Sequence, residues 1–143
     1  MKMLVKIYIE ILIAGRFDRC KGKYSCVLEI EHNGIPVSKV HYGAWKEISL
    51  QRLQLRACIT AMEHMVRESE VEIHINAPSI KSMFTSEKTS FPAKNKDLWK
   101  RFMELCEKHL VTIVQEKQNI CSEAMRQQLK NMDIEYQEEK IGE

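Results

Sequence analysis

Cysteine and histidine are the residue types in this chain that could bind a metal or act as nucleophiles, and their spacing favours neither role. The five cysteines are odd in number and widely separated, with no Cys-x-x-Cys pair and no histidine pair at zinc-finger spacing. None of the five histidines has a partner four residues away. We therefore interpret the thiols as the reduced cysteines of a cytoplasmic protein and the histidines as structural.

Basic side chains with aromatic neighbours form two groups that could bind nucleic acid. Arginine and lysine neutralise phosphates, and an aromatic ring can stack on a base or a sugar. The first group surrounds Phe17 and the second accompanies Phe91 and Trp99. The candidate contacts are Arg16, Arg19, Lys21, Lys94, Lys96 and Lys100, with Lys23, Lys88 and Arg101 close to them in sequence. The alternative is that these charges only keep the domain soluble and that Trp99 belongs to the core.

Alternating apolar residues predict three strands in the first third of the chain. The segment from Val5 to Ile13 alternates at period two, a polar loop follows over residues 15–22, and further strands cover residues 23–32 and 35–45. Asn33-Gly34 is a strong hairpin signal, because both residues tolerate positive φ. Three antiparallel strands are therefore expected to open the fold.

Helical spacing begins after Ser49, an N-cap residue type, and predicts a helix to about residue 67. The remaining elements are a strand over 69–76, a short helix from Pro78, a loop over 85–94, a helix capped by Asn95 that ends near residue 109, a strand over 110–116 and a helix from Cys121. This order predicts an α/β fold with a mixed five-stranded sheet. Three antiparallel strands are followed by parallel β-α units, and helices cover both faces.

Four segments resemble the ribonuclease H family in the same order and spacing. Residues 6–10 (KIYIE) are similar to its first strand, which ends in a catalytic aspartate, and residues 50–65 to its first helix, written NNRxELxAxxxAL with a catalytic glutamate. Residues 69–84 are similar to its fourth strand with the TDSxxV motif, and residues 95–114 to its NxDLWxxLxxLxxxHxVxxxxV segment. The resemblance covers roughly residues 4–130 and implies a ribonuclease H-like fold.

The resemblance implies two Mg²⁺ about 4 Å apart, held by four carboxylates, that hydrolyse the RNA strand of an RNA:DNA hybrid. Matched residue by residue, the four positions are Glu10, Gln54, Asn76 and either Arg126 or Gln127. The usual formal charge near −4 becomes about −1, or about 0 if Arg126 reaches the site, which is too little to offset the dehydration of Mg²⁺. We expect no intact catalytic site and no cofactor, with Mg²⁺ only if the ancestral site is still active.

The four degenerate positions are expected to form a metal-free polar cluster. The amides of Gln54 and Asn76 would hydrogen-bond each other and Glu10, and the guanidinium of Arg126 would stand where cations sit in active relatives. The alternative is that these side chains are solvated remnants at the exposed end of the sheet.

Three functions remain open. The first is a non-catalytic module that binds RNA or an RNA:DNA hybrid. The second is a protein-interaction or scaffold domain without nucleic-acid contact. The third is an active hybrid ribonuclease with a rearranged metal site, which would combine Glu10 with Glu116 or Glu123.

Composition predicts one soluble domain over residues 1–132 and an acidic tail over 133–143. The chain has 143 residues, of which 44% are hydrophobic and 29% charged. No apolar stretch approaches the roughly 20 residues that a membrane helix needs, and Glu10 interrupts the apolar run that resembles a signal peptide. The net charge of +2 divides into +6 for residues 1–132 and −4 for the tail. We interpret the tail as a solvated terminus, with an intramolecular mimic of nucleic acid as the alternative.

Overall fold

A five-stranded sheet forms the centre of the structure, a computed structural model that describes residues 3–85 and 92–139. The elements in chain order are β1 (Met3–Arg16), β2 (Arg19–His32), β3 (Ile35–Ile48), α1 (Leu50–Glu63), β4 (Ser69–Ile75), α2 (Pro78–Thr85), α3 (Lys96–Cys106), β5 (Leu110–Gln115) and α4 (Ser122–Asn131). The sheet order is β3-β2-β1-β4-β5. Strands β1 to β3 are antiparallel, and β4 and β5 run parallel to β1. The predicted mixed sheet is confirmed.

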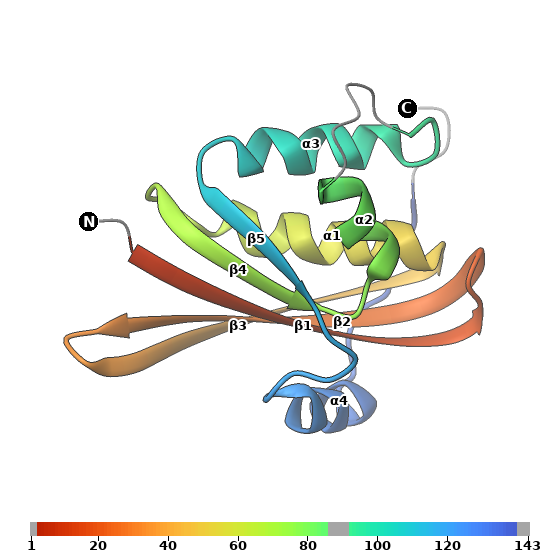
Figure 1. Cartoon of the computed structure of the whole chain (residues 1–143). Helices are drawn as coiled ribbons and strands as arrows, with labels where there is room; N and C mark the ends of the chain where they lie inside the picture. The colour runs from red at the N-terminus through yellow and green to blue at the C-terminus, as the bar shows by residue number, and fades with distance from the viewer. Residues whose placement is uncertain (1–2, 86–91, 140–143) are drawn as a thin grey trace.

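Helices cover both faces of the sheet, as predicted. Figure 1 shows α1, α2 and α3 on one face and α4 on the other. Alternation along β1 places Val5, Ile7 and Ile9 in the core beneath α1, where all three are at most 4% exposed. Trp99 of α3 is 2% exposed, so the interpretation of this residue as core is confirmed.

The polar loop predicted over residues 15–22 is wrong, because β1 and β2 continue as a hairpin to a turn at Phe17-Asp18. Their pairing extends to Arg16 opposite Arg19. Gly22, inside the expected loop, lies in β2 directly beneath Leu53, whose side chain a Cβ at this position would overlap. The residues near the turn are polar because their side chains are solvated, not because the chain leaves the strand.

The predicted hairpin at Asn33-Gly34 is confirmed, with φ angles of 53° and 78°. Helices α1 and α3 end at Glu63 and Cys106, about one turn before their predicted ends. After α1, the N–H of His64 bonds to a carbonyl three residues earlier, and such a bond tightens and ends the last helical turn. The spacing of apolar side chains does not depend on this hydrogen bond, so it does not show where the helix ends.

The interpretation of the acidic tail as a solvated terminus is wrong for its described part. The backbone N–H of Gln137 donates to the Ala44 carbonyl at 2.8 Å, and the N–H of Lys46 donates to the Gln137 carbonyl at 2.9 Å. These two bonds add a short parallel bridge to the outer edge of β3. The tail is therefore attached to the sheet after α4.

A stacked histidine pair joins β3 to the end of α1. The rings of His41 and His64 lie 3.5 Å apart between centroids, with 19° between their planes. Burial lowers the pKa of His41 below its ordinary value of 6.5, and the positive charges of His64 and Lys39 act in the same direction. The folded chain therefore favours the neutral form of His41.

We predict that acidification destabilises the protein through this pair. Below about pH 6.5 the unfolded chain binds a proton at this position before the folded chain does, so the free energy of unfolding falls until the pH reaches the folded-state pKa of His41. Urea denaturation at about pH 8 and about pH 5 measures the loss. The loss of unfolding free energy between the two pH values should be smaller in His41→Gln than in the wild type. Burial also lowers the pKa of His109, but this residue contributes equally in both proteins.

The control is His32→Gln, which changes an exposed histidine at the end of β2. This variant should retain the pH dependence of the wild type. An equal loss of stability in His41→Gln and in the wild type would contradict the assignment.

Candidate functional site

One cavity brings together the four positions that match the catalytic residues of ribonuclease H. Glu10 of β1, Gln54 of α1, Asn76 after β4 and Arg126 of α4 line a cavity of about 360 Å³. Strands β1 and β4 are neighbours and parallel, and Tyr8 pairs with His74, so Glu10 and Asn76 emerge at the same end of the sheet. Helix α1 crosses one face and α4 the other, and each contributes one side chain.

An ion pair closes one side of this cavity. Arg126 Nη1 donates to Glu10 Oε1 at 2.7 Å. The Glu10 side chain is only 11% exposed and that of Arg126 is 46% exposed, so the carboxylate is mostly shielded while its partner reaches solvent. The expected pairing of a guanidinium with Glu10 is present.

The amide contacts differ from the expectation. The Gln54 side chain donates to the backbone carbonyl of Asn76 at 3.3 Å, not to its side chain. The Asn76 side-chain oxygen accepts instead from Gln115 Nε2 at 2.8 Å, and Gln115 Oε1 accepts from the N–H of Ala77 at 2.7 Å. Sequence reasoning missed Gln115, although its place at the end of β5, paired with Ile75, is a usable signal.

The structure also decides which residue of α4 faces Glu10. Arg126 lines the cavity, whereas Gln127 lines a separate hollow with Tyr42. Lys117, which the sequence did not single out, lines the cavity as well. The site therefore contains two cations where sequence matching anticipated at most one.

The donor set does not fit the two Mg²⁺ ions of active ribonucleases H. Mg²⁺ prefers clustered oxygen ligands with negative charge, but Glu10 is the only acidic residue that lines this cavity among the described residues, and a guanidinium holds one of its oxygens. With Lys117 and Arg126 the formal charge of the lining is +1. In residues 3–85 and 92–139, no group of three or more His, Cys, Asp and Glu side chains could hold a metal.

The two acids suggested for a rearranged site lie elsewhere. Glu116 Oε1 lies 2.7 Å from His74 Nδ1, within hydrogen-bonding distance, and Glu123 is exposed in the first turn of α4. Neither residue lines the cavity with Glu10. Their positions do not support a rearranged carboxylate cluster.

The first basic group is engaged within the molecule. Arg16 pairs with Asp18 at 3.3 Å, Arg19 forms an ion pair with Glu47, and the Lys21 ammonium lies 4.2 Å from the centroid of the Tyr136 ring. Lys23, its neighbour on β2, donates to two carbonyls at the end of α4. These cations already have partners in the folded chain.

The second basic group lies around the start of α3. Lys94 lines a hollow of about 470 Å³ next to the cavity, and the two share Phe17, Leu50 and Gln54. Lys96 and Lys100 are exposed on α3, while Lys88 and Phe91 lie outside the described residues. We call the cavity and this hollow together the polar groove. Its charged lining residues are Glu10, Asp18, Lys94, Lys117 and Arg126.

No family model and no curated protein matches the chain, but solved structures do. LC9-RNase H1, described as a type 1 RNase H with the type 2 active-site motif, has a TM-score of 0.73 and 17% identity over 89% of this chain and 70% of its own. RNase H1 from the halophilic archaeon Halobacterium salinarum NRC-1 has a TM-score of 0.64 and 17% identity over 90% and 99%. LC11-RNase H1, in complex with an RNA/DNA hybrid, has a TM-score of 0.64 and 13% identity over 85% of this chain and 92% of its own.

At these identities the likeness establishes the fold. The resemblance inferred from four sequence segments is confirmed at that level: the chain has the ribonuclease H-like fold. The cavity described above lies at the positions that the sequence resemblance matched to catalytic residues, and its side chains carry the opposite sign of charge. The fold of this chain therefore does not by itself imply the chemistry of its site.

We predict that the wild-type protein binds Mn²⁺ at this cavity with a dissociation constant above about 1 mM. Restoring the acids in Gln54→Glu/Asn76→Asp/Arg126→Asp should strengthen binding at least about tenfold, because four carboxylates then face one another and the guanidinium is gone. Titration followed by electron paramagnetic resonance of free Mn²⁺ measures both affinities.

A matched control replaces Arg126→Asp with Gln127→Asp in the same triple variant. The new carboxylate then faces the separate hollow beside Tyr42, so the gain should be lost. Equal gains in both triple variants, or tight Mn²⁺ binding by the wild type, would show that the donor set has been misjudged.

Proposed function

We propose that the chain is a non-catalytic ribonuclease H-like module that binds nucleic acid along the polar groove. The observation that carries the proposal is the reversed charge of the cavity, where Lys117 and Arg126 outnumber Glu10. Such a lining repels divalent cations and attracts phosphates. The same end of the fold that serves metal-dependent hydrolysis in active relatives would here hold the backbone of a nucleic acid.

Particular side chains suit this role. Arg126 keeps 46% of its side chain exposed while paired with Glu10, so its remaining N–H groups can reach a phosphate. Lys94 supplies a second cation farther along the groove. Phe17 lies between them and is 72% exposed, which suits stacking on a base or a sugar. LC11-RNase H1 is a fold neighbour in complex with an RNA/DNA hybrid, and we propose this hybrid or a structured RNA as the ligand of the present chain.

The free thiols support a reducing compartment. All five cysteines are unpaired and four are buried, among them Cys26 and Cys58. Burial raises the pKa of the Cys106 thiol to about 12, which keeps it protonated and unreactive. Among the described helices, none has the length and apolar character to span a bilayer. We propose a cytoplasmic location.

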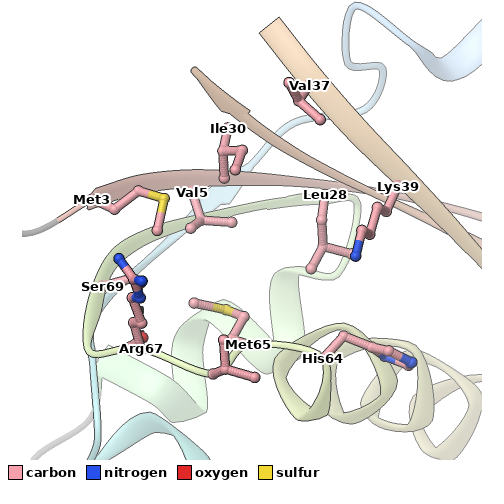
Figure 2. Close-up of a pocket in the computed structure, with 11 residues that line it drawn as sticks. Met3, Val5, Leu28, Ile30, Val37, Lys39, His64, Met65, Arg67 and Ser69 are labelled. Atoms are coloured by element: carbon pink, nitrogen blue, oxygen red, sulfur yellow. Dashed lines mark hydrogen bonds between the residues drawn. The ribbon is translucent and has the colours of Figure 1, made fainter. Parts of the chain in front are cut away.

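An apolar pocket favours protein interaction as a second candidate function. Figure 2 shows this pocket between β1, the β2–β3 hairpin and the end of α1. Its lining residues include Met3, Leu28, Ile30, Val37 and Met65, with Lys39 and Arg67 at the rim. Val66, which also lines it, is 95% exposed. A scaffold domain would use such a surface, which lies just beyond the C-terminal end of α1, whereas Gln54 is near the start of that helix.

Binding to an RNA:DNA hybrid at two salt concentrations tests the first function. We expect measurable affinity at low salt and a steep loss as salt rises, because phosphate contacts release counterions. Lys117→Gln should weaken binding and reduce the slope of log K against log salt by about one unit. Fluorescence anisotropy of a labelled hybrid measures both quantities.

The control is Lys108→Gln, which removes the same charge just before β5 begins, at the opposite end of that strand from the groove. It should leave the slope unchanged. Negligible binding at low salt would eliminate the nucleic-acid function and leave protein interaction as the better candidate.

Hydrolysis of the same labelled hybrid with Mg²⁺ and with Mn²⁺ tests the non-catalytic part of the proposal. We expect intact substrate with the wild type and with Glu10→Ala, because the described residues contain no carboxylate cluster that could hold the ions. Cleavage by the wild type that disappears in Glu10→Ala would show that the active-enzyme alternative is correct.

A further inference from the structure

The C-terminal segment Tyr136–Glu139 crosses a basic surface that the polar groove does not include. Figure 1 shows the blue chain after α4 passing the sheet toward the helices of the other face. Two backbone bonds tie Gln137 to Ala44 and Lys46 of β3. The side chain of Glu139 thereby lies against the side of α1 that bears Arg52 and Arg56.

Two arginines of α1 hold the carboxylate of Glu139. Arg52 Nε donates to it at 2.8 Å, and Arg56 donates through Nε at 3.1 Å and through Nη2 at 2.8 Å. Residues four apart lie on the same side of a helix, so the two guanidinium groups converge. The side chains of Arg52 and Arg56 are only 20% and 28% exposed.

The arginines are held in position by groups other than Glu139. Arg52 also makes a two-bond contact with Asp97 of α3, at 2.9 and 2.7 Å, and the Arg56 guanidinium lies 4.3 Å from the centroid of the Trp45 ring. Removing Glu139 would therefore leave a pair of oriented guanidinium groups. Burial tends to raise the pKa of Glu139, but hydrogen bonds from both arginines lower it overall, as expected for a carboxylate held in its charged form.

The rest of the segment covers further cations. Tyr136 lies beneath the Lys21 ammonium, and Glu138 pairs with Lys46 at 3.2 Å. With the two arginines, four cations of the β2–β3–α1 surface have partners in the four residues Tyr136–Glu139. The segment presents one aromatic ring and two carboxylates to this surface, much as a nucleic acid presents bases and phosphates.

This surface adjoins the polar groove at the start of α3. Arg52 is next to Gln51, whose side-chain oxygen accepts from Asn95 Nδ2 at 2.9 Å. Gln51 in turn lines the hollow that contains Lys94. A nucleic acid that lies along the groove can therefore extend past Lys94 to the two arginines.

We propose that Arg52 and Arg56 form a phosphate-binding site, that Glu139 occupies it in the free protein, and that a backbone phosphate of bound nucleic acid displaces the C-terminal segment. The inference rests on the proposed nucleic-acid function and adds a second contact region with its own regulation. Guanidinium pairs bind phosphate in the same two-bonded geometry as carboxylate. The tail lowers the apparent affinity by the fraction of molecules in which it fills the site.

The test compares Glu139→Gln with the wild type in RNA:DNA hybrid binding. Removing the competing charge should raise the affinity about threefold or more. Glu135→Gln is the matched control, because it removes the same charge from an exposed position of the same tail. In the Glu139→Gln background, Arg56→Gln should abolish the gain.

A second measurement examines the arginine site without nucleic acid. In Glu139→Gln, titration with inorganic phosphate should shift the NMR signal of the Arg56 Nε–H at lower phosphate concentration than in the wild type. No difference between the two proteins in this titration overturns the assignment of the arginines as a phosphate site.

The outcomes separate the inference from the proposed function. Hybrid binding that is equal in the wild type and Glu139→Gln overturns the inference and leaves the proposed function standing. Absence of hybrid binding in both proteins overturns the proposed function, and with it the nucleic acid as the ligand of the arginines. Tighter phosphate binding without tighter hybrid binding assigns the site to an anionic partner other than nucleic acid, which also overturns the inference.

Discussion

The close packing of α1 against the sheet is the constraint on which two regions of this protein depend: the cavity that contains Gln54, and the arginine pair Arg52 and Arg56. Small side chains on its inner face, Ala57, Cys58 and Ala61, are fully buried, and Gly22 of β2 leaves room for Leu53. The helix can therefore lie close enough to the sheet for Gln54 to reach the backbone at the end of β4. A bulkier interface would lift α1 away from the strands, and its polar side chains would lose these partners.

The rotation of α1 about its axis then divides its polar side chains between two surfaces. Gln54 faces the groove on one side, and Arg52 and Arg56 meet the C-terminal segment on another. In the cavity, two amides and Arg126 stand at three of the four positions matched to carboxylates, and Lys117 adds a second cation. At the other surface, the carboxylate of Glu139 pairs with both arginines. Helix α1 contributes side chains to both regions and so connects them.

Much of the fold and part of the site were predictable because they depend on local sequence. Strand alternation, the Asn33-Gly34 hairpin and the order of elements predicted the mixed sheet. The resemblance of three separate segments to ribonuclease H motifs placed Glu10, Gln54 and Asn76 at one site, and all three line one cavity. The length of the first hairpin was mispredicted, since solvated strands and polar loops have similar compositions. The partner of the Asn76 amide was also mispredicted, because Gln115 reaches it from a distant strand.

The sequence by itself determined the fold class, because the order of the elements follows from local periodicity. The resemblance of four segments to ribonuclease H then implied the loss of three acids. Only the tertiary structure decided which residue of α4 meets Glu10, that Lys117 joins it, and where the acidic tail lies. These outcomes depend on how separate elements are oriented in space. Arg126 and Gln127 are neighbours in sequence but line different hollows, and Glu139 meets arginines more than eighty residues earlier in the chain. Local sequence patterns cannot predict contacts between residues so far apart in the chain.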